Sequence, residues 1–179
     1  PVPQFPSVKE KEVLGWVEDG DVQTIIASGE YSLRALGTAG HGIAGYKFDI
    51  PEKGKTLYLE YRNFASNGNK YDSQYKELYK TNGKRVDSLP MKSGLVCYLI
   101  DTGTKFPNNM NSSPSKWNYQ VLGNQYSTMV DAAVGVDEEK WITDNLSIMV
   151  TAIDGNTLTF TIEGNFAEHI HSGGQATCV

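Results

Sequence analysis

The feature of the sequence that most constrains the fold is a pair of alternating apolar runs joined by one tight turn. Apolar residues occupy every second position before and after Asp154-Gly155-Asn156. They are Ile148, Val150 and Ala152 on one side and Leu158, Phe160 and Ile162 on the other. A period of two places these side chains on one face of each strand, and Asp-Gly between two such runs is a strong hairpin signal. We therefore predict an antiparallel hairpin with one buried face.

Other short runs of the same kind follow one another along the chain. They lie at 13–17, 22–26, 29–36, 44–50, 56–62 and 95–101, with turn residues between them. No run sustains the 3.6-residue period of an amphipathic helix, and the ten tyrosines add to a composition that favours strands. The sequence thus predicts an all-β fold, an antiparallel, jelly-roll-like β-sandwich with long irregular loops. The core predicted between its two sheets comprises Leu57, Leu59, Tyr61, Val96, Tyr98, Ile148, Val150, Phe160 and Ile162.

The length of 179 residues suits one domain with its own core. Residues 1–11 are rich in proline and then charged, so we expect a linker or the end of a preceding domain there. Residues 12–166 would form the β-sandwich and residues 167–179 a polar tail. The stretch 63–94 is long, polar and rich in turn residues. We expect it to contain a short helix near Ser73–Tyr79 and to be the least stable part of the domain.

The segment Gly40-His41-Gly42-Ile43-Ala44-Gly45 has the G-x-G-x-x-G spacing of dinucleotide-binding loops. That function needs a strand before the glycines and a helix after them, whose N-terminus receives the pyrophosphate. The residues that follow here, Tyr46, Phe48 and Ile50, alternate as in a strand, and Pro51 ends the run. We therefore interpret the glycines as a connection between two strands. Some of them would adopt positive φ, and the segment would not bind NAD, FAD or ATP.

Composition and motifs argue against several classes of function. The net charge of −5 comes without a basic block, so nucleic acid is not an expected partner. No apolar run approaches the roughly 20 residues of a membrane-spanning helix. The sequence has no HExxH, GxSxG or P-loop motif and no visible nucleophile–base pair, so we do not expect this chain to be an enzyme. Cys97 lies in an apolar run and is interpreted as a buried free thiol, with a disulfide to Cys178 as the alternative.

Two groups of residues contain side chains of the types that bind metal ions. One is the histidine-containing end of the chain, with His169, His171, Glu168 and Cys178. The other is a set of candidate calcium ligands, Asp131, Asp137, Glu138 and Glu139, whose spacing does not match an EF-hand loop. We interpret both groups as solvated polar residues and expect no cofactor, with calcium as the alternative for the second.

Glu60 and Arg62 share one face of their predicted strand, opposite Leu59 and Tyr61. If that face is exposed, the two residues form a modest surface ion pair. If it is covered, the pair must be well hydrogen-bonded, because a buried unpaired charge is costly. In either case we favour a structural role.

Several stretches occur in an order that resembles a known arrangement. They are Leu14-Gly15-Trp16, Gly29-Glu30-Tyr31-Ser32-Leu33, Tyr58-Leu59-Glu60-Tyr61-Arg62, the glycine-led run 94–100 and the terminal hairpin over 144–162. Together they resemble the β-sandwich region that follows the catalytic domain in secreted metallopeptidases of the gametolysin and immune-inhibitor-A type. The resemblance spans roughly residues 13–164. The HExxH helix of that family is absent, and the insert 65–92 is longer and more polar than the arrangement leads us to expect.

The resemblance implies a non-catalytic accessory domain of an extracellular protein. Such a domain would pack against the preceding catalytic domain of the same protein or position a protein substrate for it. The alternative is a carbohydrate-binding module, because jelly-roll domains often bind glycans through exposed aromatic side chains. The candidate ligand-binding residues are Trp117, Tyr119, Tyr126 and Tyr75, with Tyr71 and Tyr79 near the last of them.

Overall fold

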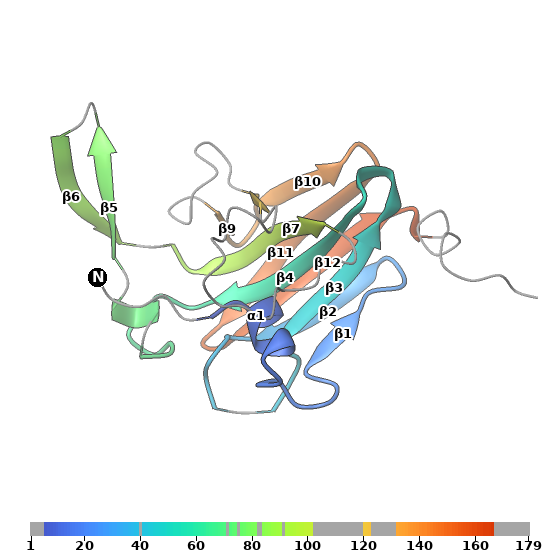
Figure 1. The fold of residues 1–179 in the computed structure, drawn as a ribbon, viewed down its shortest axis with the longest axis horizontal. Helices are drawn as coiled ribbons and strands as arrows, with labels where there is room; N and C mark the ends of the chain where they lie inside the picture. Colours follow the sequence, from blue (N-terminus) through green and yellow to red (C-terminus); the bar gives the residue numbers. More distant parts are fainter. Residues whose placement is uncertain are drawn as a thin grey trace, which may run out of the picture.

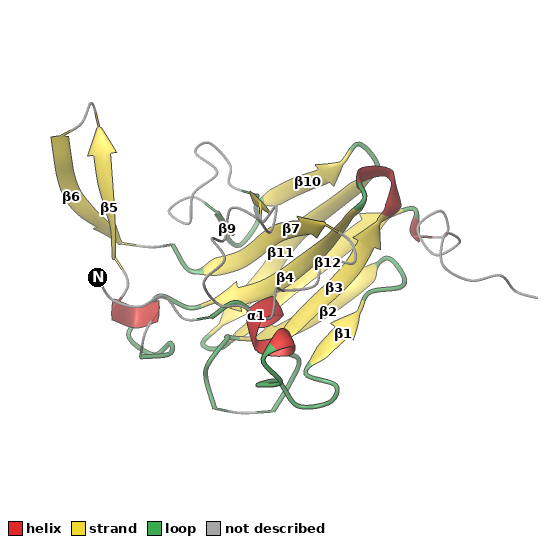
Figure 2. Ribbon diagram, viewed as in Figure 1, coloured by secondary structure: helices red, strands yellow, loops and turns green. Residues whose placement is uncertain are grey.

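The computed structural model of the chain describes residues 6–39, 41–70, 72–74, 76–81, 84–90, 92–101, 120–122 and 132–166. These residues are mostly β-strand with one short α-helix, so the β-rich class predicted from the sequence is confirmed. The strands form two larger sheets, which we call sheet A and sheet B, and a separate hairpin (Figures 1 and 2). Nowhere in the described ranges is there a helix with the length and apolarity needed to cross a membrane.

Sheet A has six strands. Their order is β1 (Val22–Thr24), β3 (Gly45–Ile50), β4 (Lys55–Arg62), β7 (Gly94–Asp101) and β8 (Gln120–Val121), and β9 (Ala133–Val134) also pairs with β7. The β1–β3 pair is parallel and the other pairs of this sheet are antiparallel. A 3-10 turn, η1 (Pro51–Lys53), joins β3 to β4 and ends at Gly54 in the left-handed conformation. The predicted strands at 44–50, 56–62 and 95–101 are therefore confirmed.

Sheet B has four antiparallel strands in the order β10 (Glu139–Thr143), β11 (Leu146–Asp154), β12 (Thr157–Gly164) and β2 (Gly29–Arg34). The hairpin predicted around Asp154-Gly155-Asn156 is the β11–β12 pair, with Ile148 opposite Ile162 and Val150 opposite Phe160. Gly155 has a φ of 56°, the left-handed conformation that a tight turn of this kind requires. The turn and the alternation agree with this register up to Val150. A bulge between Val150 and Ala152 then shifts it, so Ala152, predicted to face inward, is exposed, and Ile153 packs on the core instead.

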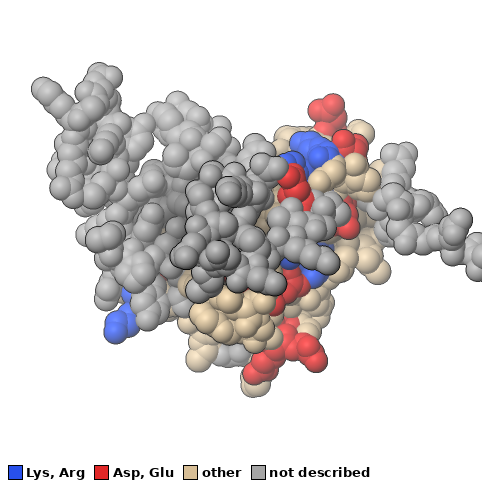
Figure 3. All heavy atoms as spheres, viewed as in Figure 1, with Lys and Arg blue, Asp and Glu red and all other residues tan. Residues whose placement is uncertain are grey.

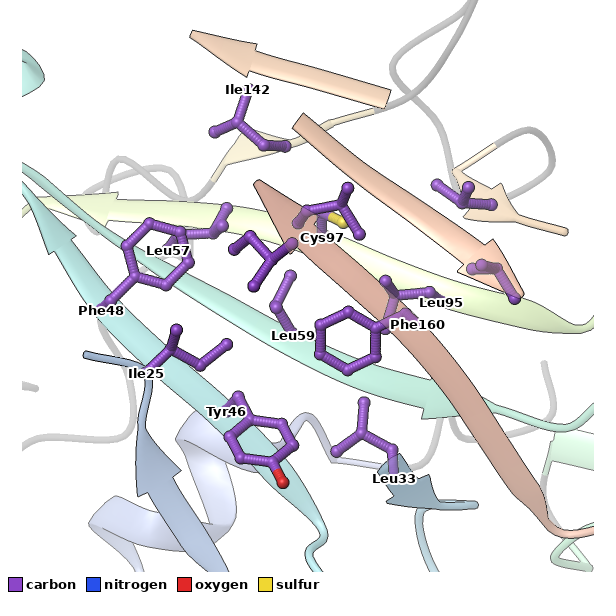
Figure 4. Close-up of a cluster of buried hydrophobic side chains, with 14 of the residues drawn as sticks. Ile25, Leu33, Tyr46, Phe48, Leu57, Leu59, Leu95, Cys97, Ile142 and Phe160 are labelled. Carbon is purple, nitrogen blue, oxygen red and sulfur yellow. The ribbon is translucent and has the colours of Figure 1, made fainter. Parts of the chain in front are cut away.

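One large hydrophobic cluster contains side chains from both sheets (Figure 4). We call the face of each sheet that contributes to this cluster its inner face. Sheet A contributes Tyr46, Phe48, Ile50, Leu57, Leu59, Tyr61, Leu95, Cys97 and Leu99, and sheet B contributes Leu33, Leu146, Ile148, Val150, Leu158, Phe160 and Ile162. Tyr46 and Phe160, from opposite sheets, meet edge to face with ring centroids 5.9 Å apart.

The predicted core is wrong at two positions of β7. Val96 and Tyr98 belong to a second cluster on the outer face of sheet A, together with Val8, Leu36 and Tyr58. The inner face of β7 carries Leu95, Cys97 and Leu99 instead. Because β7 is buried on both faces, apolar residues occupy consecutive positions and the alternation that would distinguish the faces is lost.

The outer face of sheet A is covered by helix α1 (Val8–Val13). The Ser7 side chain accepts from the N–H of Glu10, and the Glu10 side chain accepts from the N–H of Ser7, which is a capping box. Val8 is fully buried against the sheet. Part of the stretch expected to be a linker is therefore helical, and the strand expected over 13–17 is absent because the chain is still helical at Val13 and turns at Leu14.

The polar stretch 63–94 contains η2 (Asp72–Gln74) and the two-stranded hairpin of β5 (Lys76–Thr81) and β6 (Lys84–Pro90). The helix expected near Ser73–Tyr79 is wrong, since only the 3-10 turn precedes β5. Figure 1 shows the hairpin standing apart from the two sheets. Its strands pair only with each other among the described residues.

The glycine-rich segment connects β2 to β3, as predicted, and a strand rather than a helix follows it. Gly42 has a φ of 124°, where a side chain would be strained. Gly45 is needed for a different reason, since a Cβ atom there would lie 2.7 Å from Cγ2 of Val8. Gly40 lies outside the described residues. The glycines described here serve backbone conformation and the close approach of α1.

Candidate functional site

The most concentrated set of charged side chains lies beneath α1, on the outer face of sheet A. We call it the Arg62 cluster, and it comprises Glu60, Arg62, Asp72, Asn69 and Tyr98. Arg62 Nε donates to Glu60 Oε1 at 2.6 Å, and its Nη1 donates to both carboxylate oxygens of Asp72 at 3.0 and 3.2 Å. Glu60 and Arg62 are 1% and 2% exposed. Of the two arrangements predicted for Glu60 and Arg62, the covered and hydrogen-bonded one is therefore correct.

Every carboxylate of the Arg62 cluster is held by several donors. Glu60 Oε2 accepts from the N–H of Val8 at 2.7 Å and from the Tyr98 hydroxyl at 3.1 Å. Asn69 Nδ2 donates to Asp72 Oδ2 at 2.7 Å, and Asn69 Oδ1 accepts from the N–H of Asp72 at 2.8 Å. Buried charges that are this fully bonded act as a structural clamp. No substrate can reach these oxygens while α1 is in place.

A second polar set ties the other end of α1 to the same face. Glu12 accepts hydrogen bonds from Lys47 of β3 and from the Tyr58 hydroxyl of β4. Burial opposes ionisation of Glu12, but the Lys47 ammonium and the Tyr58 hydroxyl outweigh it, so the pKa of Glu12 is lowered. Burial and the nearby Glu12 charge raise the pKa of Tyr58. Acidic and basic side chains are correspondingly interspersed on the side of the molecule shown in Figure 3.

Cys97 is a free, fully buried thiol on the inner face of β7. Burial raises its pKa to about 12, which keeps it protonated at neutral pH. A nucleophilic cysteine needs an accessible thiolate, so Cys97 is a core residue. Its interpretation as a buried free thiol is confirmed, and Cys178 lies outside the described residues.

The structure does not describe any of the ligand-binding candidates predicted from the sequence. Trp117, Tyr119, Tyr126 and Tyr75 lie outside the described residues, as do Glu168, His169, His171 and Asp131. His41 is exposed in the β2–β3 connection. Glu138 pairs with Lys92, and its carboxylate also accepts from the N–H of Gly135. Within the described ranges, no three His, Cys, Asp or Glu side chains gather as metal ligands would.

The outer face of sheet B differs from that of sheet A because most of its described side chains are open to solvent, although Ser147 is buried. Along β12 the inward residues are buried, whereas Thr157, Thr159, Thr161 and Glu163 alternate with them and are exposed or half-buried. Trp141 on β10 is 61% exposed and Met149 on β11 is 41% exposed. Ile142 and Lys140, the neighbours of Trp141, are buried, so the indole is directed outward by the strand alternation. Trp141 and Met149 lie on neighbouring strands and are the large exposed apolar side chains of this face among the described residues.

Trp141 belongs to a row of three cross-strand partners. It is directly opposite Ser147 on β11, which is directly opposite Glu163 on β12. Direct partners in an antiparallel sheet project from the same face with their Cβ atoms roughly 5 Å apart. The row therefore places an indole ring and a carboxylate on one face with a small hydroxyl between them.

Two shallow hollows adjoin on this face and share Glu163 and Gly164. The first, which we call the Trp141 hollow, is lined by Trp141, Asp144, Asn145, Ser147, Glu163, Gly164 and Asn165. The second, the Glu30 hollow, is lined by Ser28, Gly29, Glu30, Thr161, Ile162, Glu163 and Gly164. Asp144 and Asn145 come from the β10–β11 turn, and Asn165 follows the end of β12. One aromatic platform is thus surrounded by carboxylate, amide and hydroxyl groups.

This arrangement suits a ligand with one apolar face and a polar edge. The π-face of an indole is large, rigid and negatively polarised, so it attracts the C–H groups of a flat, weakly apolar ring. The surrounding oxygens accept hydrogen bonds from hydroxyl or amino groups at the edge of that ring. The sequence carries no clear signal for this site, because the neighbours of Trp141 are a lysine and an isoleucine, and this mixed pair does not indicate which face the indole takes.

Comparison with known proteins gives no matching family model, no similar curated protein and no similar solved structure.

Proposed function

We propose that this chain is a non-catalytic β-sandwich domain of an extracellular protein and that it binds a glycan on the outer face of sheet B. The sandwich architecture is supported by the hydrophobic cluster to which both sheets contribute. Two sheets that share one core leave their outer faces for other uses, and helix α1 covers part of only one of them.

The observation that carries this proposal is the exposure of Trp141 beside the polar lining of its hollow. A sugar ring has axial C–H groups on its faces and hydroxyls around its edge. Trp141 would stack on one face of the ring, and Asp144, Asn145 and Glu163 would accept hydrogen bonds from the hydroxyls. A sheet provides a rigid base, so little backbone freedom is lost on binding.

A non-catalytic role is supported by the state of the reactive groups described here. The carboxylates of the Arg62 cluster are buried and bonded to partners in the fold, and Cys97 is a protonated core thiol. Binding without chemistry also agrees with an open, shallow surface, because catalysis usually needs a site that excludes water.

A glycan array tests the proposal, with Trp141→Ala as the variant and Trp16→Ala as the matched control. Trp16 is 64% exposed, close to the 61% of Trp141, but it follows α1, its N–H donates to the carbonyl of Lys11, and it lines neither hollow. Loss of a stacking platform at the centre of a site should weaken binding at least about tenfold. Trp16→Ala should bind as the wild type does. Equal glycan binding by the wild type and Trp141→Ala would exclude the outer face of sheet B as the binding site. If the wild type bound no glycan on the array, the glycan-binding function itself would be excluded.

A second candidate, an accessory domain that packs against the catalytic domain of a metallopeptidase-like protein, is favoured by one observation. Val13, Leu14 and Trp16 are large apolar residues, each more than two-fifths exposed, at the end of α1. Leu14 and Trp16 also belong to one of the stretches that carry the resemblance to those proteins. Exposed apolar residues that are close in sequence are typical of a surface that another domain covers.

Iodide quenching of Trp16 fluorescence tests this second candidate. The chain has three tryptophans, so Trp117→Phe and Trp141→Phe leave Trp16 as its only tryptophan, which can be excited beyond the absorption of tyrosine. Joined to such a catalytic domain with the tryptophans of that domain replaced by phenylalanine, Trp16 should be quenched several-fold less than in this chain alone. The same quenching in both would exclude Val13, Leu14 and Trp16 as the contact surface and leave the glycan proposal untouched.

A further inference from the structure

The charged side chains that line the two hollows of sheet B all have the same sign. Asp144 and Glu163 line the Trp141 hollow, and Glu30 and Glu163 line the Glu30 hollow. Glu139 is also exposed and lies in the row Glu139–Met149–Thr161–Glu30 of directly opposed residues. Neither hollow has a lysine or arginine among its described lining residues. A ligand in either hollow therefore meets only negative charge among the described lining residues.

Three basic side chains of the described residues are held by other partners. Lys140 lies next to Trp141 in sequence, but it is buried and donates to the carbonyl of Leu122. Lys53 donates to the carbonyl of Ile142 at 2.8 Å. Arg34 is on β2, where its guanidinium pairs with Asp21 at 3.0 Å and donates to the carbonyl of Gly42 at 2.9 Å. These contacts hold the cations against backbone carbonyls and Asp21, away from the lining of the hollows.

We propose that this face selects glycans free of carboxylate and sulfate groups, and that Glu163 is the main determinant of this selectivity. The inference rests on the proposed glycan-binding function and specifies its ligand class. Glu163 is the one charged residue that lines both hollows, so it faces a ligand in either of them. Neutral sugars and amino sugars present donors, and hydrogen bonds to a carboxylate are stronger than those to neutral acceptors.

An acidic sugar would be rejected by direct repulsion. Two like charges about 6 Å apart in water oppose each other enough to lower affinity about threefold, and several carboxylates on one face act together. This repulsion is screened by salt, because the Debye length falls from about 10 Å at 0.1 M to about 3 Å at 1 M. Selectivity against anionic glycans should therefore weaken as salt is added.

The experiment compares matched glycans that differ only in charge. Suitable probes are sialylated glycans with their desialylated forms and oligogalacturonates with their methyl esters, on one array at 50 mM and 1 M salt. The proteins are the wild type, Glu163→Gln and Asp19→Asn. Glu163→Gln keeps size and an acceptor oxygen but removes the charge. Asp19→Asn removes one charge from an exposed turn before β1, on the other sheet.

For the wild type we expect the uncharged member of each bound pair to bind at least about threefold more tightly at low salt. Glu163→Gln should reduce that ratio, high salt should reduce it too, and Asp19→Asn should leave it unchanged. Equal binding of charged and uncharged members, still dependent on Trp141, would overturn the selectivity and leave the glycan-binding function standing. An unchanged ratio in Glu163→Gln would overturn the role of Glu163. Failure to bind any probe would overturn both the function and the inference.

Discussion

The backbone N–H of Val8 donates a hydrogen bond to Oε2 of Glu60 across 2.7 Å, although the two residues are 52 positions apart in the sequence. Glu60 Oε1 at the same time accepts from Arg62 Nε. One carboxylate therefore joins the start of α1 to the buried charge of β4. The stability of the covered face of sheet A should depend on this residue more than on surface charges elsewhere.

Glu60→Gln should destabilise the domain by about 3–5 kcal/mol, because it removes one partner of a buried ion pair. Glu138→Gln is the matched control, since Glu138 pairs with Lys92 where both side chains are nearly half exposed. Glu138→Gln should lower the free energy of unfolding by about 1 kcal/mol or less. Urea unfolding of the two variants and the wild type measures both values. Equal losses of unfolding free energy in the two variants would show that the Arg62 cluster stabilises the domain no more than a surface ion pair does.

Val8 and Gly45 should show strong energetic coupling. Val8→Ala should cost about 2 kcal/mol through lost burial. Gly45→Ala places a methyl group 2.7 Å from Cγ2 of Val8, and such overpacking costs about 1–3 kcal/mol. Removing the Val8 methyl groups relieves that clash, so the double variant should lose less than the sum of the single losses by at least about 0.5 kcal/mol. Strict additivity in a double-mutant cycle would mean that α1 does not pack on Gly45.

The attachment of α1 through Glu12 should weaken in acid. The pKa of Glu12 is lowered in the folded state from its ordinary value of 4.5, so its contribution is fully present above pH 4.5. The contribution is lost as the pH falls through the lower, folded-state pKa. The wild type should therefore be more stable than Glu12→Gln at pH 7, and the difference should shrink as the pH falls below 4.5. Unfolding free energies of both proteins across this range provide the check, and a constant difference would contradict the assignment.

Amide hydrogen exchange should be fastest, among the strands, in β5 and β6. These two strands form a hairpin that pairs with no other described strand, and an isolated two-stranded hairpin is marginally stable in water. Exchange in β4 and β7, which lie inside sheet A, should be limited by global unfolding. Slow exchange in Lys76–Thr81, comparable to that of β4, would show that the hairpin is a stable part of the domain.

The elements that could be predicted from the sequence are those with local signals. Asp-Gly at 154–155, between two alternating runs, indicated the turn and the inward residues Ile148, Val150, Leu158, Phe160 and Ile162, but not the bulge that turns Ala152 outward. Alternation after Gly45 and the following Pro51 distinguished a strand from the helix of a dinucleotide-binding loop. In each case one face of the strand meets the core, so the pattern carries the information.

The errors arose where local patterns carry little or conflicting information. Both faces of β7 are buried, so Val96 and Tyr98 could not be told from Leu95 and Cys97 by hydrophobicity. Helix α1 is only six residues long, too short for a clear 3.6-residue period, although the Ser7–Glu10 capping box was a usable signal. Trp141 was missed because its exposure depends on how β10 pairs with β11.

The bond from Val8 to Glu60 also decides how the domain would respond to a pulling force. A force applied at residue 7 would pass through α1 into β4, which is flanked by β3 and β7 in sheet A. Strand β1, at the edge of the same sheet, would be bypassed. Extension from this end would therefore first have to detach α1 from the buried charge network. We expect the resistance to a force on this end of the domain to lie at the covered face.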